Sequence, residues 1–322
     1  MIEVKNLRKE FTVDGKKLLA VRDVSFSIAK GETLGLVGES GCGKSTTGRC
    51  LLRLEEPTSG KVFYEGRDLV SLNKKELFTF RRNAQIIFQD PYSSLNPRMT
   101  AKDIIAEPLR IHGVMKEPAL DKYLAELLSL VGLSRSVLSR FPHEFSGGQR
   151  QRIGIARALA LKPHFLVCDE PISALDVSIQ AQIVNLLKNL QKDLSLTYLF
   201  IAHDLAMIKY ISDRVAVMYL GSIVEIAPAE ELYKNPKHPY TLALLASIPL
   251  PDPVLERKRQ HFCFSGEVPR ALVSPKGCPF ASRCPQATQK CRDILPQWTE
   301  ISPGHKVACH LFDDQLCHSN IK

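Results

Sequence analysis

The sequence predicts an α/β fold in which a core with a parallel sheet is joined by an antiparallel β subdomain, a helical subdomain and a small Cys-rich C-terminal extension. Three short, largely apolar runs predict the core, namely residues 33–37, 165–168 and 197–202. Buried strands of a parallel sheet have this character. The runs are followed by a glycine-rich loop, by two acids and by a histidine. Because ligands of open α/β sheets bind at the carboxyl ends of strands, these residues are the first candidates for a functional site.

Length and composition indicate an ordinary globular protein. The 322 residues suffice for one large domain and a smaller one, and no apolar run approaches the length of a membrane span. The first residues lack the apolar core of a signal peptide, so we expect the chain to stay in the cytoplasm. The net charge of +9 would allow nucleic acid or an anionic membrane surface as a partner. Because Lys and Arg are spread along the sequence, a basic protein near anionic lipid or phosphate ligands is favoured.

The N-terminal part is predicted to be β structure. Residues 2–4 and 20–28 alternate apolar and polar side chains, and Asp14-Gly15 lies between these segments as a turn signal. Phe11 comes just before that turn. Its side chain either packs in the core or offers an aromatic face to an adenine ring, and the residues alone favour neither.

Residues 38–46 read Gly-Glu-Ser-Gly-Cys-Gly-Lys-Ser-Thr and fit the P-loop pattern G-x-x-x-x-G-K-[ST]. A strand-like run precedes them and residues 46–54 can continue as a helix, which is the context that the motif requires. The glycines allow backbone N–H groups to approach a phosphate, Lys44 can reach the β- and γ-phosphates, and the Ser45 hydroxyl can ligate Mg²⁺. The predicted phosphate-binding residues are Gly38, Glu39, Ser40, Gly41, Cys42, Gly43, Lys44, Ser45 and Thr46. A chance glycine-rich turn is the alternative.

The middle of the chain is predicted to change from strands to helices. Residues 61–66 and 86–88 are strand-like, and the second run ends at Gln89. From residue 100 to about 140 the apolar residues recur at helical spacing, most clearly over 120–131. Ser146-Gly147-Gly148-Gln149 then opens a further helix, whose N-terminus is either a second anion site or only a capped turn.

Two acids and a histidine complete the candidate site. Asp169 and Glu170 follow the apolar run 165–168, where the first can hold Mg²⁺ and the second can polarise an attacking water. A solvated strand end would explain one acid but poorly explains two. His203 follows the run 197–202 and can contact a γ-phosphate, although a lone histidine is usually structural.

In this order and spacing, the motifs resemble those of the ATP-binding-cassette (ABC) ATPases, over residues 1 to about 235. The resemblance implies a P-loop NTPase with a RecA-like core. It further implies that Phe11 stacks on adenine, that Gln89 ligates Mg²⁺ with Ser45 and Asp169, that Glu170 is the catalytic glutamate and that His203 is the switch histidine. Residues 146–149 resemble the signature motif, which contacts the γ-phosphate bound to an opposite subunit, and Asp176 closes the motif 173–176. Phe145 replaces a commoner Leu, and no catalytic position is degenerate.

Residues 235–245 and 89–97 resemble those of ATPases that serve bacterial oligopeptide and dipeptide importers. This resemblance implies a cassette domain over 1–235 with a helical subdomain at about 92–160, and an importer-type extension over 236–322. The implied function is the ATP-hydrolysing subunit of a peptide importer, and specifically the second of two paralogous ATPase subunits. A nickel or glutathione importer of the same group is an alternative, and a soluble cassette ATPase acting on nucleic acid or ribosomes is a less favoured one.

The resemblance also implies partners. They are a paralogous ATPase subunit, two transmembrane permease subunits and an extracytoplasmic substrate-binding protein, with no nucleic acid. The expected location is the cytoplasmic face of the inner membrane.

The extension carries a group of cysteines. Cys278, Cys284, Cys291 and Cys309 have spacings unlike those of C-x₂-C zinc sites. Four thiolates suit an iron–sulfur cluster, and related importers carry one here, so a [4Fe–4S] cluster is expected. Zinc, with His305 or His310 assisting, is the second candidate, and a set of buried thiols is the third. Cys263 and Cys317 look uninvolved.

Overall fold

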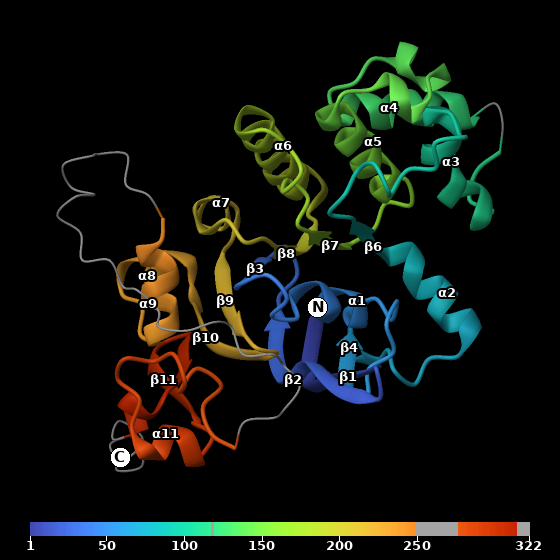
Figure 1. Ribbon diagram of the computed structural model, residues 1–322. Helices are drawn as coiled ribbons and strands as arrows, with labels where there is room; N and C mark the ends of the chain where they lie inside the picture. Colours follow the sequence, from blue (N-terminus) through green and yellow to red (C-terminus); the bar gives the residue numbers. More distant parts are fainter. Residues whose placement is uncertain (117–118, 249–275, 314–322) are drawn as a thin grey trace, which may run out of the picture. The chain divides into compact units, whose positions relative to one another are not determined.

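The computed structural model describes residues 1–116, 119–248 and 276–313. The chain forms two compact units. Within the described ranges, the first consists of Met1, 28–33, 71–116 and 119–202, and the second of 2–27, 34–70, 203–248 and 276–313. Each is described separately below (Figure 1). None of the helices within the described ranges combines the length and the apolar character that a membrane span requires.

The first unit combines parallel strands with helices. Its elements are α2 (Lys74–Asn83), β6 (Ala84–Ile87), α3 (Ala101–Ile111), α4 (Ala119–Leu130), the 3₁₀ turns η1 (Arg135–Ser139) and η2 (Pro142–Glu144), α5 (Gly147–Leu159), β7 (Phe165–Asp169), α6 (Val177–Leu194) and β8 (Thr197–Ile201). Strand β7 pairs in parallel with β6 on one side and with β8 on the other. All residues of β7 and β8 are buried, which confirms the prediction of parallel core strands from apolar runs.

The predicted helical block is α3 to α5. Leu120, Leu124, Leu127 and Leu128 of α4 are buried, as the helical spacing of the apolar residues predicts. The Tyr123 hydroxyl donates a hydrogen bond of 2.9 Å to the carbonyl of Ala160, which fixes α4 against the end of α5. Pro108 lies inside α3, one turn before that helix ends.

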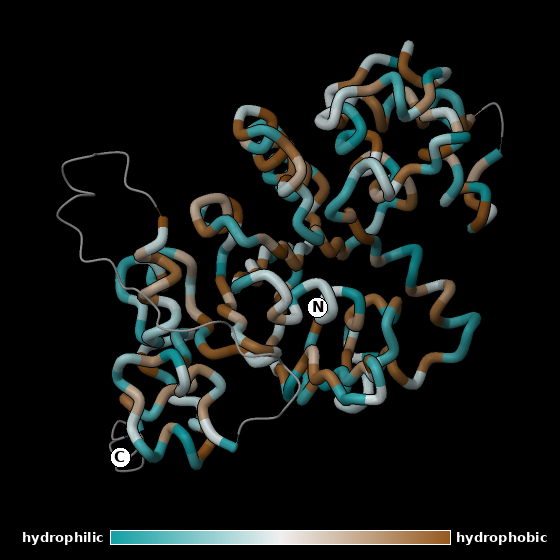
Figure 2. Tube along the Cα trace, in the orientation of Figure 1, coloured by the Kyte–Doolittle hydropathy of each residue, from teal (hydrophilic) through white to brown (hydrophobic). Residues whose placement is uncertain are grey.

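The second unit contains two sheets and several helices. Its elements are β1 (Ile2–Val13), β2 (Lys16–Ile28), β3 (Thr33–Val37), α1 (Lys44–Leu51), β4 (Ser59–Tyr64), β5 (Arg67–Asp68), α7 (Leu205–Ile211), β9 (Arg214–Tyr219), β10 (Ser222–Pro228), α8 (Ala229–Lys234), α9 (Pro239–Ala246), α11 (Gln289–Asp293), β11 (Trp298–Ser302) and β12 (His305–Ala308). The order β2-β1-β4-β5 makes the predicted N-terminal sheet, in which β4 is antiparallel to both of its neighbours. The buried strand β9 runs brown in Figure 2 and is parallel to β3.

The C-terminal extension continues a sheet of the second unit. Strand β12 is antiparallel to β10 and to β11, so the order is β11-β12-β10-β9-β3. The sequence predicted no strands here. Buried Glu225 of β10 stabilises the contact with the extension, because its carboxylate lies 2.7 Å from Nε2 of buried His305. The same carboxylate accepts hydrogen bonds from the backbone N–H groups of Lys237 and His238, at 2.8 and 3.0 Å.

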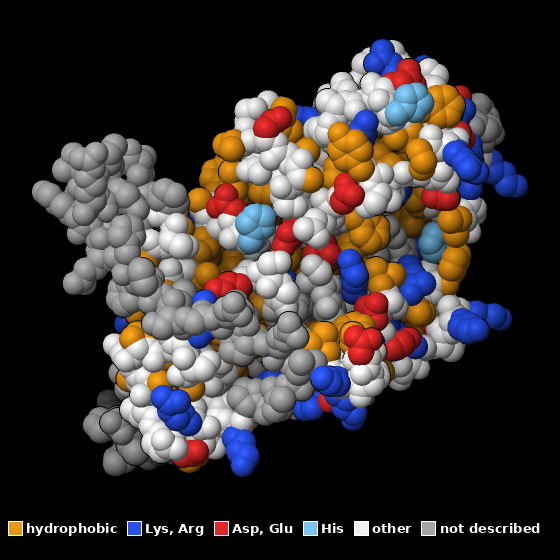
Figure 3. All heavy atoms as spheres, in the orientation of Figure 1, with side chains coloured by type: hydrophobic (Ala, Val, Ile, Leu, Met, Phe, Trp, Pro, Cys, Tyr) orange, Lys and Arg blue, Asp and Glu red, His pale blue; other side chains and the backbone are white. Residues whose placement is uncertain are grey.

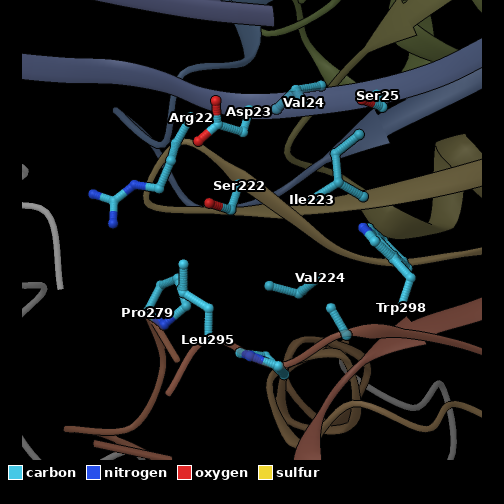
Figure 4. A pocket seen from close by; sticks show the side chains of 12 residues that line it. Arg22, Asp23, Val24, Ser25, Ser222, Ile223, Val224, Pro279, Leu295 and Trp298 are labelled. Carbon is cyan, nitrogen blue, oxygen red and sulfur yellow. The ribbon is translucent and has the colours of Figure 1, made fainter. Parts of the chain in front are cut away.

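A cavity of about 130 Å³ lies between β2, β10 and the extension. Arg22 and Ser222 line it from the two strands, and Pro279, Leu295 and Trp298 line it from the extension (Figure 4). The extension therefore packs on the strands of its unit through side chains as well as through the strand ladder.

Candidate nucleotide site

The P-loop connects β3 to α1 in the second unit, as the sequence predicts. A Cβ atom on Gly43 would lie 2.1 Å from the carbonyl oxygen of Ala20, and the backbone there has φ of 106°. A Cβ on Gly38 would lie 2.1 Å from the carbonyl oxygen of Met218. Only glycine fits at these two positions, so the tight course of the loop depends on them.

Lys44 is the first residue of α1 and is 4% exposed. Its ammonium donates hydrogen bonds to the carbonyls of Gly38 and Glu39, at 2.9 and 3.0 Å. The cation therefore lies inside the loop, close to the N-terminus of the helix. Positive charge from the lysine and from the helix dipole converges there, which suits a phosphate group.

The other loop residues differ in exposure. Ser45 and Thr46 are partly exposed in the first turn of α1, and Ser40 is exposed at the tip of the loop. Cys42 is buried, and burial raises the pKa of its thiol. It is therefore a neutral packing residue at pH 7.

Phe11 and His203 also belong to the second unit. Phe11 lies in β1 with its ring partly exposed, and the Lys9 ammonium is 4.7 Å from the ring centroid. His203 is exposed directly before Asp204, whose carboxylate caps α7. Both side chains are thus accessible, as a contact with a nucleotide would require.

The first unit brings Gln89 and Glu170 together. The Gln89 side-chain nitrogen donates a hydrogen bond of 2.8 Å to the Glu170 carboxylate. Asp169 ends β7 and is 1% exposed, whereas Glu170 is partly exposed. The Glu170 backbone has φ of 46° and its N–H donates to the carbonyl of Ile201. This turn points the two acids in different directions, one buried and one reachable from solvent.

Residues 146–149 begin α5 in the first unit. The Ser146 hydroxyl accepts from the Gln149 N–H at 3.3 Å, and the Gln149 side chain accepts from the Ser146 N–H at 3.1 Å. This reciprocal capping box fixes the helix start. A Cβ on Gly148 would lie 2.6 Å from a methyl carbon of Ile179 in α6, so the glycine permits close packing. Asp176 is exposed directly before α6.

The four cysteines of the extension lie close enough to influence one another. Burial raises the pKa of Cys278 to about 11, and the neighbouring thiols of Cys291 and Cys284 add to the rise. Burial likewise raises the pKa of Cys309 to about 12, with contributions from the other three. Within the described ranges, however, no group of three or more His, Cys, Asp or Glu side chains is arranged to hold a metal ion. Cys263 and Cys317 lie outside the described residues.

One contact of the P-loop was missed by sequence reasoning. The guanidinium of Arg283 in the extension pairs with the Glu39 carboxylate at 2.9 Å, and the Tyr240 hydroxyl accepts the Glu39 backbone N–H at 2.9 Å. Arg283 lies 244 residues from Glu39 along the chain, and no local pattern links two positions so far apart.

Comparisons with known proteins agree with the motifs. The ABC transporter family model matches residues 21–173, and the model for the oligopeptide/dipeptide transporter C-terminal region matches 224–291. A putative oligopeptide transport ATP-binding protein, YkfD of Bacillus subtilis (strain 168), is 57% identical over 314 residues, which cover 97% of this chain and 95% of the relative. The oligopeptide transport ATP-binding protein OppF of the same organism is 54% identical over 311 residues, covering 96% of each.

A solved structure agrees as well. The dimeric structure of MJ0796, described as a bacterial ABC transporter cassette, matches with a TM-score of 0.65 and 30% identity over 71% of this chain and 99% of that one. The fold class and the family resemblance predicted from the sequence are thereby confirmed. The chain therefore belongs to the ATPases of the ABC transporter family and carries the C-terminal region of its oligopeptide/dipeptide branch.

Proposed function

We propose that the chain is the ATP-hydrolysing subunit of a membrane importer for peptides, and that it couples ATP binding and hydrolysis to uptake. The observation that carries this proposal is the match over nearly the whole length to relatives named oligopeptide transport ATP-binding proteins. The match includes the C-terminal extension, so it covers more than the generic cassette. Nickel and glutathione importers of the same group remain the alternative.

The proposed roles of the site residues follow the family resemblance. Residues 38–46 bind the triphosphate, and Phe11 stacks on the adenine ring. When bound, Mg²⁺ would be held by Ser45, Gln89 and Asp169 and would neutralise phosphate charge. The hydrogen bond between Gln89 and Glu170 suits this arrangement, because the amide nitrogen holds the carboxylate while the amide oxygen stays able to accept a metal.

Glu170 is the proposed general base. Its carboxylate takes the proton of the attacking water, and the hydrogen bond from Gln89 orients it. His203 then contacts the γ-phosphate. These two residues are partly exposed or exposed in the structure, so water can reach both.

The proposed active species is a dimer in which residues 146–149 of one chain contact the nucleotide held by the other, with Asp176 nearby. The capping box at Ser146 supports this role, because it orders the N-terminus of α5. The backbone N–H groups that follow Ser146 then point toward the position where a phosphate would bind. The proposed partner chain is a paralogue, which makes a heterodimer. Two permease subunits and an extracytoplasmic binding protein complete the assembly.

The proposed position is peripheral, on the cytoplasmic face of the membrane. The helical block of about 92–160 within a 1–235 cassette domain would dock on the permeases, with 236–322 as the extension. On the face shown in Figure 3, Lys and Arg side chains are interspersed with acidic and uncharged side chains. A soluble ATPase acting on ribosomes or DNA is the less favoured proposal because the chain carries the C-terminal region of the oligopeptide/dipeptide transporters.

Affinity purification of the tagged chain from native membranes tests the proposed function. We expect two integral membrane proteins and a second, related ATPase to co-purify at equal stoichiometry, and transport of a peptide to require ATP. Co-purification with ribosomal proteins or DNA, at the expense of membrane proteins, would contradict the proposal. A nickel- or glutathione-dependent ATPase in the same complex would favour the alternative cargo.

We further propose that Cys278, Cys284, Cys291 and Cys309 hold a [4Fe–4S] cluster with a structural role. The other thiols add to the rise in the pKa of Cys278 and Cys309, and the Cys278 N–H donates to the Cys291 carbonyl at 2.7 Å, which supports their being neighbours. A single zinc ion, the second candidate, would need the sulfurs within about 4 Å of one another, since each Zn–S bond is about 2.3 Å. The described side chains include no group of three or more that is arranged to hold a zinc ion or a cluster, so this proposal rests on the family resemblance.

Metal analysis of anaerobically purified protein tests the cysteine group. We expect about four iron atoms and four sulfides per chain, with broad visible absorption that weakens on reduction and is lost when the iron is removed. Cys284→Ser should lose most of the iron, whereas Cys50→Ser, a buried thiol of α1, should retain it. Protein with neither iron nor sulfide would rule the cluster out, and about one zinc per chain would support the second candidate.

A further inference from the structure

The extension reaches the P-loop directly. Nη1 of Arg283 lies 2.9 Å and 3.2 Å from the two Glu39 carboxylate oxygens, and Nη2 lies 3.2 Å from one of them. Such a bidentate pair fixes orientation as well as distance. The Arg283 side chain is 8% exposed and that of Glu39 is 25% exposed, so the pair is shielded from solvent more than an ordinary surface ion pair.

Glu39 is held at its backbone too. Its N–H donates a hydrogen bond of 2.9 Å to the hydroxyl of Tyr240, a fully buried residue of α9. The helix is fixed in turn by His238, whose Nδ1 accepts the Tyr240 N–H at 3.0 Å. Burial lowers the pKa of His238 to about 4, against the opposing charge of Glu225. The imidazole is therefore neutral at pH 7 and keeps the lone pair that caps α9.

Arg283 has little freedom to move. Its backbone N–H donates to the carbonyl of Phe280, and Phe280 is buried in a cluster of aromatic rings. The Phe280 ring lies 5.2 Å from that of Tyr219 and 5.4 Å from that of Tyr240, centroid to centroid. Because Cys284 is the next residue, whatever orders the four thiols also fixes the backbone that carries Arg283.

The carbonyls that receive the Lys44 ammonium belong to Gly38 and Glu39. The extension therefore contacts Glu39, whose backbone carbonyl accepts a hydrogen bond from Lys44. A shift of Glu39 would move its carbonyl and change the position of the ammonium. A displacement of about 1 Å would stretch a hydrogen bond from the ammonium to a phosphate oxygen beyond its normal range.

We propose that Arg283 is a positioning residue for ATP binding: through Glu39 it holds the P-loop and Lys44 in the conformation that accepts the triphosphate. The extension thus acts on the nucleotide site in addition to packing against its unit. This inference rests on the proposed role of residues 38–46 as the triphosphate site.

Equilibrium binding of the nonhydrolysable analogue AMP-PNP with Mg²⁺ to the full chain tests the inference. We expect Arg283→Gln to raise the Kd by about tenfold, because the bidentate pair orients the loop before the ligand arrives. In the assembled transporter the KM for ATP should rise by a similar factor, with kcat within roughly twofold of the parent. Arg283→Lys should recover only part of the affinity, since an ammonium cannot form the fork.

The loop side of the pair gives an independent variant. Glu39→Gln removes the charge while leaving the extension intact, and it should raise the Kd as Arg283→Gln does. The double variant should bind no more weakly than the weaker single variant, because both remove one interaction. Arg292→Gln is the matched control: it removes an exposed arginine of α11 in the same extension and should leave the Kd unchanged.

Two results would overturn the inference. One is a Kd for Glu39→Gln and Arg283→Gln equal to that of the parent, and the other is a double variant whose loss is the sum of the single losses. Lys44→Ala separates this failure from failure of the proposed site. If Lys44→Ala binds AMP-PNP normally, the triphosphate site itself is wrong. If Lys44→Ala abolishes binding while the Arg283 and Glu39 variants bind normally, the triphosphate site is correct and only the positioning role of Arg283 is wrong.

Discussion

Glu170→Gln is expected to abolish ATP turnover while ATP binding persists. The substitution preserves the size of the side chain and an oxygen that can accept the hydrogen bond from Gln89. It removes the carboxylate that we propose accepts the proton of the attacking water. Loss of a positioned general base lowers the rate about 10²- to 10⁴-fold, so kcat should decrease by a factor in that range. Phosphate release by the assembled transporter measures the rate, and equilibrium binding of ATP measures the affinity.

A substitution at an exposed acid outside the site provides the control for Glu170→Gln. Glu230→Gln alters an exposed acid of α8 that pairs with Lys234 on the same helix, and it should hydrolyse ATP at the parent's rate. ATP should also hold the Glu170→Gln complex in the proposed dimeric state, since binding without turnover removes the step that reopens it. Normal hydrolysis by Glu170→Gln in the full complex would show that another group serves as the base.

The strands and the local motifs could be predicted because their causes lie in adjacent residues. The apolar runs of β7 and β8 become fully buried strands, and the helical spacing over 120–131 becomes α4. The serine at 146 caps α5 through a box formed with Gln149, three residues away. In each case the pattern that predicts the element lies within one short segment, even where the pairing strands are distant in sequence.

The contacts of the extension could not be predicted for the opposite reason. Strands β11 and β12 are short and carry charged side chains. Strand β12 is stabilised by pairing with β10 some 80 residues earlier, and β11 pairs with β12. Glu225 is an acid within an apolar strand, and its partners at 237, 238 and 305 are separate in sequence. Likewise, nothing near Glu39 indicates that Arg283 will meet it. Such pairs depend on tertiary structure, which a single sequence does not reveal.

Glu225→Ala is expected to release the C-terminal extension from its unit. Glu225 and His305 are each fully buried, and the carboxylate accepts three hydrogen bonds. Removing it leaves the His305 ring and two backbone N–H groups buried without that acceptor. Breaking a buried pair by deleting one partner costs about 3–5 kcal/mol, a large part of the 5–15 kcal/mol that typically stabilises a domain.

The chain's single tryptophan reports this event. Trp298 lies in β11, so its fluorescence during urea denaturation follows the extension, while far-UV circular dichroism follows the whole chain. For Glu225→Ala the fluorescence transition should move to lower urea and precede the loss of helical signal. Glu225→Gln keeps the shape and one acceptor oxygen, so it should cost less, about 1–3 kcal/mol.

Glu300→Gln in the same pair of strands is the matched control. Glu300 is exposed and pairs with Lys306 at 3.8 Å, and glutamine keeps an oxygen that can accept the Gly304 N–H. Its effect should stay within about 0.5 kcal/mol. A Trp298 transition of Glu225→Ala that coincides with that of Glu300→Gln would mean that the strand ladder and the side chains around the cavity hold the extension without Glu225. The affinity for ATP gives a second readout for Glu225→Ala. An extension that detaches also breaks the pair between Arg283 and Glu39, so ATP affinity should fall as well.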